Sequence, residues 1–529
     1  MGREEKADLI LNRQAMASHT FVTGSTGTGK SNAVYHLLDE ITKDGRTSFL
    51  VVEPAKGEYK NVFGSRADVK VFGTNPRETP LLRINPFAFP QDIHILEHID
   101  RLVEIFNACW PMYAAMPAVL KDAIERSYQK AGWNLRNSES EKGVFPTFFD
   151  LLDILPGVIE ESHYSKDTQS DYVGALCTRV KSLTNGIYGS VFCAEDALSD
   201  AELFDCNVVV DLSRVGSMET KSLLMGILVM KLQEYRMCGS EMNSRLRHVT
   251  VLEEAHNLLR KTSAEQSQEG ANLQGKSVEM LANAIAEMRT YGEGFIIADQ
   301  APGLLDMSVI RNTNTKIILR LPDEEDRKLV GKSAALKEAQ IDELSKLPLG
   351  VAAVYQNEWP EAVLCKIEAY PMPENAVYHK PSKMPHEINA EFVFGQLAAG
   401  KELEPLSISE MEQLKLWLKR HEMMLKPGDS RYLEQVFAGG ELDVAKTRKA
   451  VFDFFGGIST VVDYCAVAEK SFTPRKEFLE QLQGQYGLKA AAADWVLNSV
   501  ISMGMSLNPD AKAVENLRTN FEQQGGRVL

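Results

Sequence analysis

The chain has 529 residues, a length that allows three or four domains of roughly 150 residues each. Its composition, 44% hydrophobic and 25% charged, excludes a disordered or fibrous chain. With 58 Lys and Arg against 73 Asp and Glu, the formal charge is -15, which excludes a histone-like mode of nucleic-acid binding but not a local basic channel.

The cysteines, the N-terminus and the apolar runs indicate the cellular compartment of the protein. The seven cysteines are scattered and form no CxxC pair, a pattern typical of reduced thiols in the cytoplasm. The charged N-terminus has no apolar segment of the signal-peptide kind. The longest apolar run, residues 223–232, is interrupted by Lys231 and is too short to cross a bilayer. We therefore expect a cytoplasmic protein without a membrane partner.

Strand and helix patterns alternate along most of the chain. The predicted strands are residues 19–22, 48–52, 69–72, 208–212, 249–252, 294–298, 316–319 and 351–355. Helical periodicity at 34–41 and 218–237 separates some of these strands. Between about 86 and 200 the pattern is helical instead, with predicted helices at 95–107, 117–131 and 172–184. This order predicts an α/β core with a mostly parallel sheet and a helical insertion.

The pattern changes after Ile367. Prolines at 371, 373, 381 and 385 are typical of a linker, and the signal from about 407 to 522 is helical. The predicted organisation is a core over 1–370 with its insertion at about 86–200, a linker over 371–405 and an all-helical C-terminal domain over 406–529.

A phosphate-binding loop stands near the start of the chain. Residues 24–31 match GxxxxGK[ST] and lie between an apolar strand and an amphipathic helix, a context that argues against a chance match. Backbone N–H groups and the helix N-terminus would cradle the phosphates of ATP, Lys30 would reach the β- and γ-phosphates, and Ser31 would hold Mg²⁺. The predicted nucleotide-binding residues are Gly24, Ser25, Thr26, Gly27, Thr28, Gly29, Lys30, Ser31 and Asn32. The motif predicts a RecA-like P-loop core.

Two glutamates end the predicted strand 249–252. Glu253 is placed to serve the metal and Glu254 to polarise an attacking water, which favours hydrolysis over phosphoryl transfer to a metabolite. Two solvated glutamates at a strand end are the alternative interpretation. Asp211, at the end of the strand 208–212, is the rival metal ligand.

Further catalytic candidates follow the glutamates in sequence. Gln300 ends the strand 294–298, where it could sense the γ-phosphate. Arg289, Arg311 and Arg320 are candidates for an arginine finger that acts on a neighbouring subunit. For each arginine, an ordinary surface residue or ion-pair partner is the alternative.

Several segments together resemble the HerA family of hexameric DNA translocases, which is grouped with FtsK and the conjugation ATPases. They are Phe21-Val22-Thr23, Glu53-Pro54-Ala55-Lys56-Gly57-Glu58-Tyr59, Leu252-Glu253-Glu254-Ala255-His256-Asn257, Glu287-Met288-Arg289-Thr290-Tyr291-Gly292, Ala298-Asp299-Gln300-Ala301-Pro302 and Asn312-Thr313-Asn314-Thr315-Lys316-Ile317. The resemblance spans about 11–367 and implies a ring of six subunits, with ATP between neighbours and duplex DNA in the pore. HerA relatives usually carry a small β-barrel before the ATPase; because the P-loop stands so near the start of the given sequence, this barrel is expected to be either absent or removed.

The segment 260–276 is the predicted pore loop. Arg260, Lys261 and Lys276 flank its polar stretch, and six copies of these cations could line a positive channel that contacts DNA phosphates. A surface loop without a DNA role is the alternative.

Two functions of different class follow. The first is an ATP-driven translocase or helicase on double-stranded DNA that acts with a nuclease or other effector, with antiphage defence suggested by the resemblance alone. The second is a ring-forming scaffold or regulatory ATPase that assembles and controls such an effector, encoded nearby, without processive translocation. A metabolite kinase is disfavoured because no small-substrate motif follows the P-loop.

Overall fold

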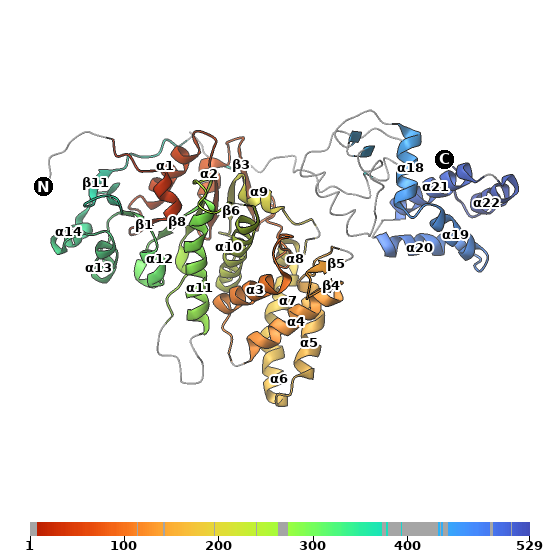
Figure 1. Ribbon diagram of the computed structural model, residues 1–529, viewed down its shortest axis with the longest axis horizontal. Helices are drawn as coiled ribbons and strands as arrows, with labels where there is room; N and C mark the ends of the chain where they lie inside the picture. Colours follow the sequence, from red (N-terminus) through yellow and green to blue (C-terminus); the bar gives the residue numbers. More distant parts are fainter. Residues whose placement is uncertain are drawn as a thin grey trace. The chain divides into compact units, whose positions relative to one another are not determined.

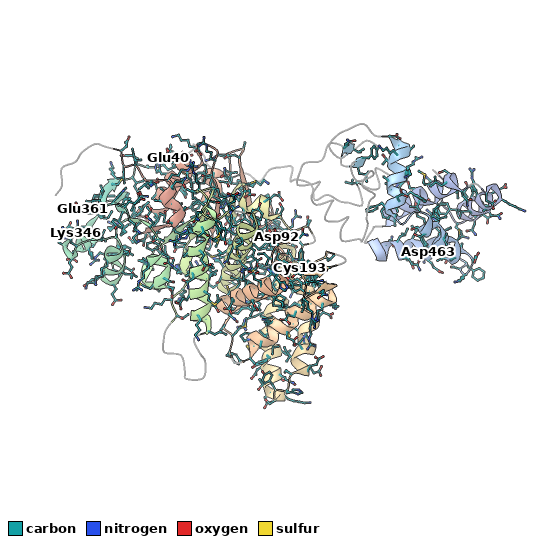
Figure 2. All side chains as sticks on the ribbon, in the orientation of Figure 1. Glu40, Asp92, Cys193, Lys346, Glu361 and Asp463 are labelled. Atoms are coloured by element: carbon teal, nitrogen blue, oxygen red, sulfur yellow. The ribbon has the colours of Figure 1, made fainter. Side chains whose placement is uncertain are left out.

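The computed structural model describes residues 8–528, apart from 114, 141–142, 195, 240, 263–272, 373–376, 379–392, 394–431, 434, 437–442, 487–489 and 509 (Figure 1). The chain forms two compact units, one of residues 1–139 with 145–380 and one of 140–144 with 381–529. Charged side chains such as Glu40, Lys346 and Glu361 cover the surface of the first unit (Figure 2).

A nine-stranded sheet is the centre of the first unit, in the order β11-β10-β9-β1-β8-β7-β2-β6-β3. Its strands are β1 (Thr20–Thr23), β2 (Ser48–Glu53), β3 (Val69–Gly73), β6 (Asn207–Asp211), β7 (His248–Glu253), β8 (Glu293–Asp299), β9 (Thr315–Ile318), β10 (Val351–Gln356) and β11 (Val363–Lys366). All pairings are parallel except those of β10 with β9 and β11. The predicted α/β core with a mostly parallel sheet is confirmed.

The parallel register places the carboxyl ends of the central strands along one edge. Thr23 of β1 pairs with Asp299 of β8, and Glu253 of β7 pairs with Ala298. Glu53 of β2 pairs with Asp211 of β6. The P-loop and the acidic residues therefore lie at this carboxyl edge. In open α/β sheets, ligands bind at the edge where the parallel strands end.

Helices cover both faces of the sheet (Figure 1). On one face, α1 (Lys30–Thr42) and α2 (Tyr59–Phe63) pack on alternate strand residues such as Phe49 and Val51. On the other face, the fully buried α10 residues Leu224 and Leu228 belong to the larger core, with α3 and α11 packed alongside. The remaining elements of the core are η1 (Gln14–Ser18), α10 (Met218–Gly239), η3 (Ala255–Asn257), α11 (Leu273–Glu287), η4 (Met288–Tyr291), η5 (Pro302–Leu304), α12 (Met307–Arg311), α13 (Glu324–Ser333), α14 (Glu338–Glu343) and η6 (Leu344–Lys346).

The segment between β3 and β6 is mainly helical. It contains α3 (Ile95–Cys109), α4 (Met116–Lys130), the hairpin β4 (Trp133–Asn134) and β5 (Glu139–Ser140), α5 (Phe148–Glu161), α6 (Lys166–Tyr172), η2 (Val173–Cys177), α7 (Thr178–Thr184), α8 (Gly186–Phe192) and α9 (Asp200–Phe204). The helix predicted at 172–184 is interrupted by the π-helical turn η2. A buried polar contact ties the segment to the core, because His98 Nδ1 of α3 lies 2.9 Å from Glu234 Oε2 of α10 and both side chains are fully buried.

The second unit contains α18 (Val444–Phe454), α19 (Ile458–Ala468), α20 (Pro474–Tyr486), α21 (Ala490–Leu507) and α22 (Ala511–Gln523). It has its own hydrophobic core, in which Phe455, Tyr464, Val500 and Phe521 are fully buried. Among the described residues, no single helix has both the length and the apolar character to cross a membrane, whereas the bent pair α18 and α19 passes that test only together.

Candidate nucleotide-hydrolysis site

The P-loop connects β1 to α1 and is held by its own hydrogen bonds. Gly29 has a φ of +108° directly before α1 begins at Lys30, a conformation that glycine adopts without a steric penalty. Ser25 N donates to Arg320 O at 2.9 Å, and Thr28 Oγ1 donates to Ser25 O at 2.7 Å. The loop therefore presents the first turn of α1 as a fixed anion-binding surface.

Lys30 is only 9% exposed, and its amine donates to Gly24 O at 2.7 Å, so it lies over the loop that the motif predicts will hold phosphates. Burial lowers the pKa of Lys30, while the charges of Glu254 and Glu253 oppose that shift. The acidic strand end and the P-loop lysine therefore share one electrostatic site.

Glu253 and Glu254 have different environments although they are adjacent. Glu253 is 7% exposed and accepts a hydrogen bond from the Tyr59 hydroxyl, and burial raises the pKa of Glu253 to about 7. Glu254 has a left-handed backbone with φ +43°, which ends the strand at a strained position of the kind found at functional sites. Its Oε2 atom is buried and makes no hydrogen bond within the described part of the chain. Burial also raises the pKa of Glu254, which makes its carboxylate a stronger proton acceptor.

His256 connects the segment after β7 to Asp299, the last residue of β8. Its backbone N–H and its Nδ1 both donate to Asp299 Oδ2, at 2.8 and 2.9 Å, and Nδ1 lies 3.6 Å from Glu254 Oε2. The hydrogen bond to Asp299 raises the pKa of His256. The ligand atoms of Glu254, His256 and Asp299 lie within 4.8 Å of one another, but both oxygens of Asp299 already accept hydrogen bonds, one of them from Ala301 N. His256 was not singled out from the sequence, although it lies two residues after Glu254.

Gln300 reaches the P-loop. Its Oε1 atom accepts a hydrogen bond of 2.7 Å from the hydroxyl of Thr26. β8 lies between β1 and β7, so the residue after its end is placed between the phosphate loop and the two glutamates. This is the position expected for a polar group that senses the γ-phosphate.

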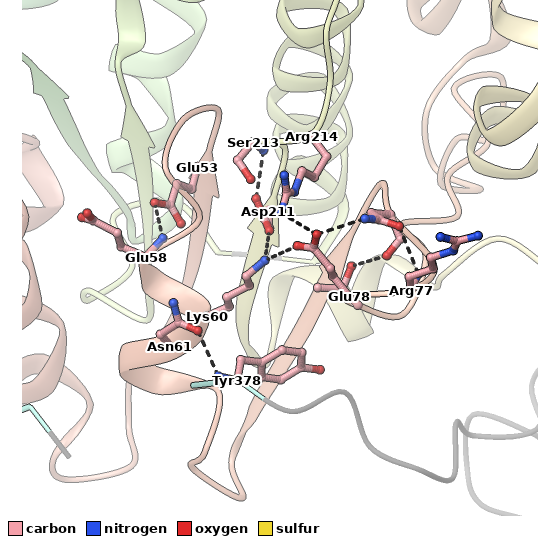
Figure 3. A network of polar contacts seen from close by, with 12 residues as sticks. Glu53, Glu58, Lys60, Asn61, Arg77, Glu78, Asp211, Ser213, Arg214 and Tyr378 are labelled. Atoms are coloured by element: carbon pink, nitrogen blue, oxygen red, sulfur yellow. Dashed lines mark hydrogen bonds and ion pairs between the residues drawn. The ribbon is translucent and has the colours of Figure 1, made fainter. Parts of the chain in front are cut away.

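Ser31 and Glu253 are the candidate ligands for Mg²⁺. A hydroxyl and a buried carboxylate are oxygen donors of the kind that Mg²⁺ prefers. The rival, Asp211, has other partners: Lys60 Nζ lies 2.7 Å from its Oδ2, and Ser213 N donates to its Oδ1 (Figure 3). β6 also lies four places from β1 in the sheet, so the geometry favours Glu253.

The three candidate arginines lie at two different edges of the sheet. Arg320 directly follows β9 at the carboxyl edge, where its backbone contacts the P-loop residue Ser25. Arg289 lies in η4, just before β8 begins, and Arg311 ends α12, just before β9 begins. All three side chains are exposed. Arg289 and Arg311 thus lie near the edge opposite to their own P-loop.

The predicted pore loop is described only at its ends. Arg260 and Lys261 follow η3 and are exposed, and Lys261 N donates to Leu304 O at 2.8 Å. Lys276 is exposed on the first turn of α11. Residues 263–272, the polar centre of the predicted loop, lie outside the described residues.

A cavity of about 450 Å³ adjoins the P-loop and has a second wall that the sequence did not reveal. That wall is residues 366–369, which start at the last residue of β11. Asn32, predicted to bind the nucleotide, lines this cavity, but its side chain bonds the wall: Nδ2 donates to Glu368 O at 2.8 Å, and Tyr370 N donates to Oδ1 at 2.7 Å. No short motif marks 366–369, so only the structure could identify this wall.

Comparisons with known proteins show what this chain resembles. The family model described as "Helicase HerA, central domain" matches residues 3–186. The DNA double-strand break repair helicase HerA of Sulfolobus acidocaldarius is 25% identical over 379 residues, 70% of this chain and 68% of that protein. A probable helicase of Methanocaldococcus jannaschii is 23% identical over 390 residues, 68% of each chain.

Two solved structures share the fold. VirB4 of Thermoanaerobacter pseudethanolicus has a TM-score of 0.52 at 19% identity and covers 67% of this chain and 90% of its own. The plasmid coupling protein TrwB in complex with a non-hydrolysable ATP analogue has a TM-score of 0.51 at 15% identity and covers 72% and 94%. The resemblance to HerA and the P-loop ATPase fold are both confirmed.

Proposed function

We propose that this protein is an ATP-driven translocase or helicase that acts on double-stranded DNA. The observation that carries the proposal is the meeting of the P-loop, Glu253, Glu254 and Gln300 at one edge of the sheet, in a chain that is HerA-like over about 70% of its length. The relatives' printed names describe DNA helicases, and that activity is extended here to this chain.

The hydrolysis step is assigned to residues of the carboxyl edge. Lys30 and the P-loop amides hold the phosphates, and Ser31 and Glu253 hold Mg²⁺, which neutralises phosphate charge when bound. Glu254 orients and polarises the attacking water through Oε2, which makes no hydrogen bond with the described residues. Gln300 contacts the γ-phosphate side of the P-loop from β8. The reaction is hydrolysis, because a base stands beside the metal ligand.

The proposed assembly is a homo-hexameric ring with a shared active site. An arginine at the edge opposite to its own P-loop, Arg289 or Arg311, can serve only a neighbour's nucleotide, whereas Arg320 lies at the carboxyl edge of its own subunit. Mixing Lys30→Ala subunits with Arg289→Ala subunits tests this. Random mixing of two inactive variants should restore roughly a quarter of the activity if Arg289 acts between subunits. No recovery with Arg289→Ala or with Arg311→Ala would exclude both as fingers.

DNA would pass through the pore of the ring, where a small number of cations in this acidic chain would contact its phosphates. Arg260, Lys261 and Lys276 are exposed and are the proposed phosphate contacts. Such contacts weaken steeply with salt and carry no sequence information. Neutralising all three should abolish DNA stimulation of hydrolysis while the basal rate stays, and unchanged stimulation would contradict the assignment.

The decisive experiment measures ATP hydrolysis with and without duplex DNA. We expect hydrolysis that rises several-fold on adding long duplex and that disappears in Glu254→Gln. The matched control is Glu358→Gln, which makes the same change at a residue outside the carboxyl edge. Hydrolysis that ignores DNA of every length would contradict translocation.

That negative result would favour the second candidate, a ring-forming scaffold ATPase that controls an effector. One observation supports an effector partner in either case: helices α18–α22 of the second unit pack around their own core, and Phe472, between α19 and α20, is fully exposed. A nuclease or other effector encoded nearby, a cytoplasmic location and a role in antiphage defence complete the proposal. Co-elution of the two products as one complex, lost when 381–529 is deleted, tests the partnership.

A further inference from the structure

The turn between β2 and α2 contains a motif that the assignment above leaves without a role. At the end of β2, the buried Glu53 carboxylate accepts a hydrogen bond from the backbone N–H of Glu58 at 2.7 Å (Figure 3). It accepts a second one from the backbone N–H of Tyr59 at 3.1 Å. The Glu53 side chain thus closes the loop of residues 54–57 by bonding the backbone on its far side. The same turn delivers the Tyr59 hydroxyl to Glu253, so the loop and the acidic strand end are built together.

Lys56 stands at the tip of this loop in an unfavourable conformation. Its φ is +67°, and Gly57 N donates to Ala55 O at 2.8 Å, which makes Lys56 the centre of a γ-turn of the rare, strained form. A glycine at this position would remove the strain. Strained residues of this kind persist where the surrounding structure imposes them, and they cluster at ligand sites.

The side chain of Lys56 lies at the nucleotide cavity. Lys56 lines it together with Gly29, Lys30 and Ser31 of the P-loop. Its side chain is 52% exposed, and its amine lies 3.9 Å from Glu58, a loose contact that a stronger anion could replace. Burial lowers the pKa of Lys30, and the positive charge of Lys56 lowers that pKa further, so the two amines act on each other.

We propose that Lys56 is a second phosphate-contacting cation of the site, which binds the terminal phosphates of the triphosphate from within the same subunit. The inference rests on the proposed function, because it assumes that ATP occupies the P-loop. Two lysines then approach the phosphates from different elements, Lys30 from α1 and Lys56 from the turn after β2. The strained turn places the second lysine at the exposed edge of the cavity.

The test measures the affinities of the full-length protein for a non-hydrolysable ATP analogue and for ADP, each with Mg²⁺. The variants are Lys56→Gly, which removes the amine and relieves the φ +67° strain, and Lys56→Arg, which keeps a cation. The control is Lys43→Ala, because Lys43 is also an exposed lysine with an acidic partner, Glu40 at 3.2 Å, but lies at the other end of α1. Melting temperatures of all variants monitor folding.

We expect Lys56→Gly to bind the triphosphate about tenfold more weakly and ADP within about threefold, with an unchanged or higher melting temperature. Lys56→Arg should recover most of the loss, and Lys43→Ala should match the unmodified chain. Unchanged triphosphate affinity in Lys56→Gly overturns the inference, as does an equal loss for ADP. If the unmodified chain binds no ATP analogue, the proposed function fails as well. If the unmodified chain and Lys56→Gly both bind the analogue normally, only the proposed role of Lys56 is refuted.

Discussion

The buried carboxylate of Glu293 offers a sharp test of what stabilises the core. It lies at the start of β8, is fully buried, and accepts hydrogen bonds from Arg236 Nε at 2.9 Å, His248 Nδ1 at 2.8 Å and Thr250 Oγ1 at 2.8 Å. Arg236 is itself 1% exposed and also pairs with Asp205 at 2.8 Å. Burial alone would raise the pKa of Glu293, but the charges of His248 and Arg236 hold it below its usual value.

Glu293→Met leaves the Arg236 guanidinium buried with one of its two carboxylates missing. Removing one partner of a buried ion pair destabilises by about 3–5 kcal/mol, whereas replacing both partners with apolar groups is often close to neutral. We therefore expect Glu293→Met and Arg236→Met each to lose several kcal/mol, and the double variant to lose clearly less than their sum. The remaining partner Asp205 is 40% exposed and can be hydrated, which favours this outcome.

The assay is thermal unfolding of the first unit at pH 7. For a unit of this size, about 4 kcal/mol corresponds to a fall of roughly 5 °C in the melting temperature. Nucleotide affinity serves as the internal control, because Glu293 lies at the strand starts, opposite to the P-loop. A loss below about 1 kcal/mol in Glu293→Met, or a double variant as unstable as the sum of the singles, would refute the reasoning.

Three further predictions concern the site and the sheet. Glu254→Gln should lower the maximal rate of ATP hydrolysis by about 10²–10⁴-fold while nucleotide affinity in equilibrium binding stays within about threefold, and a loss of binding instead would contradict its role as a base. Tyr59→Phe removes the hydrogen bond that lowers the pKa of Glu253 and opposes the raising effect of burial. Half-maximal hydrolysis should then need more Mg²⁺, and the acidic limb of the pH–rate profile should move to higher pH. Identical Mg²⁺ titrations would show that the hydroxyl is dispensable. Burial lowers the pKa of Lys316 to about 8, so its neutral form is favoured in the fold and stability should rise with pH between about 8 and 10.5. Lys316→Met should accordingly raise stability at pH 7 by about 3 kcal/mol or less, since the Lys316 bond to Thr313 O is lost, and the gain should vanish near pH 10.5, as followed by melting temperature against pH.

Local sequence patterns predicted most of the sheet because each buried strand is a short apolar run next to a turn or a helix. They missed β11, whose apolar run Val363-Leu364-Cys365 is only three residues long and whose Val363, Leu364 and Lys366 are exposed in the sheet. The P-loop and the glutamates after β7 were visible because each motif is contiguous in the chain.

Contacts between distant residues explain what the sequence could not decide. Nothing in the strand 208–212 indicates that Lys60, 151 positions away, pairs with Asp211, yet that ion pair is what separates Asp211 from Glu253 as a metal ligand. The wall at 366–369 likewise joins the site through distant residues such as Asn32, more than 330 positions earlier. Such pairings depend on the order of strands in the sheet, which a single sequence with local periodicity does not specify.

The placement of Arg289 and Arg311 near the strand starts has a kinetic consequence. If either arginine completes the catalytic site, the rate per subunit cannot be a fixed property of the chain, because the completing group is supplied by a second molecule. Specific activity would then rise with protein concentration and reach a plateau when the assembly is saturated. Dilution would switch the enzyme off without unfolding it, and any partner that holds subunits together would act as an activator without touching the nucleotide.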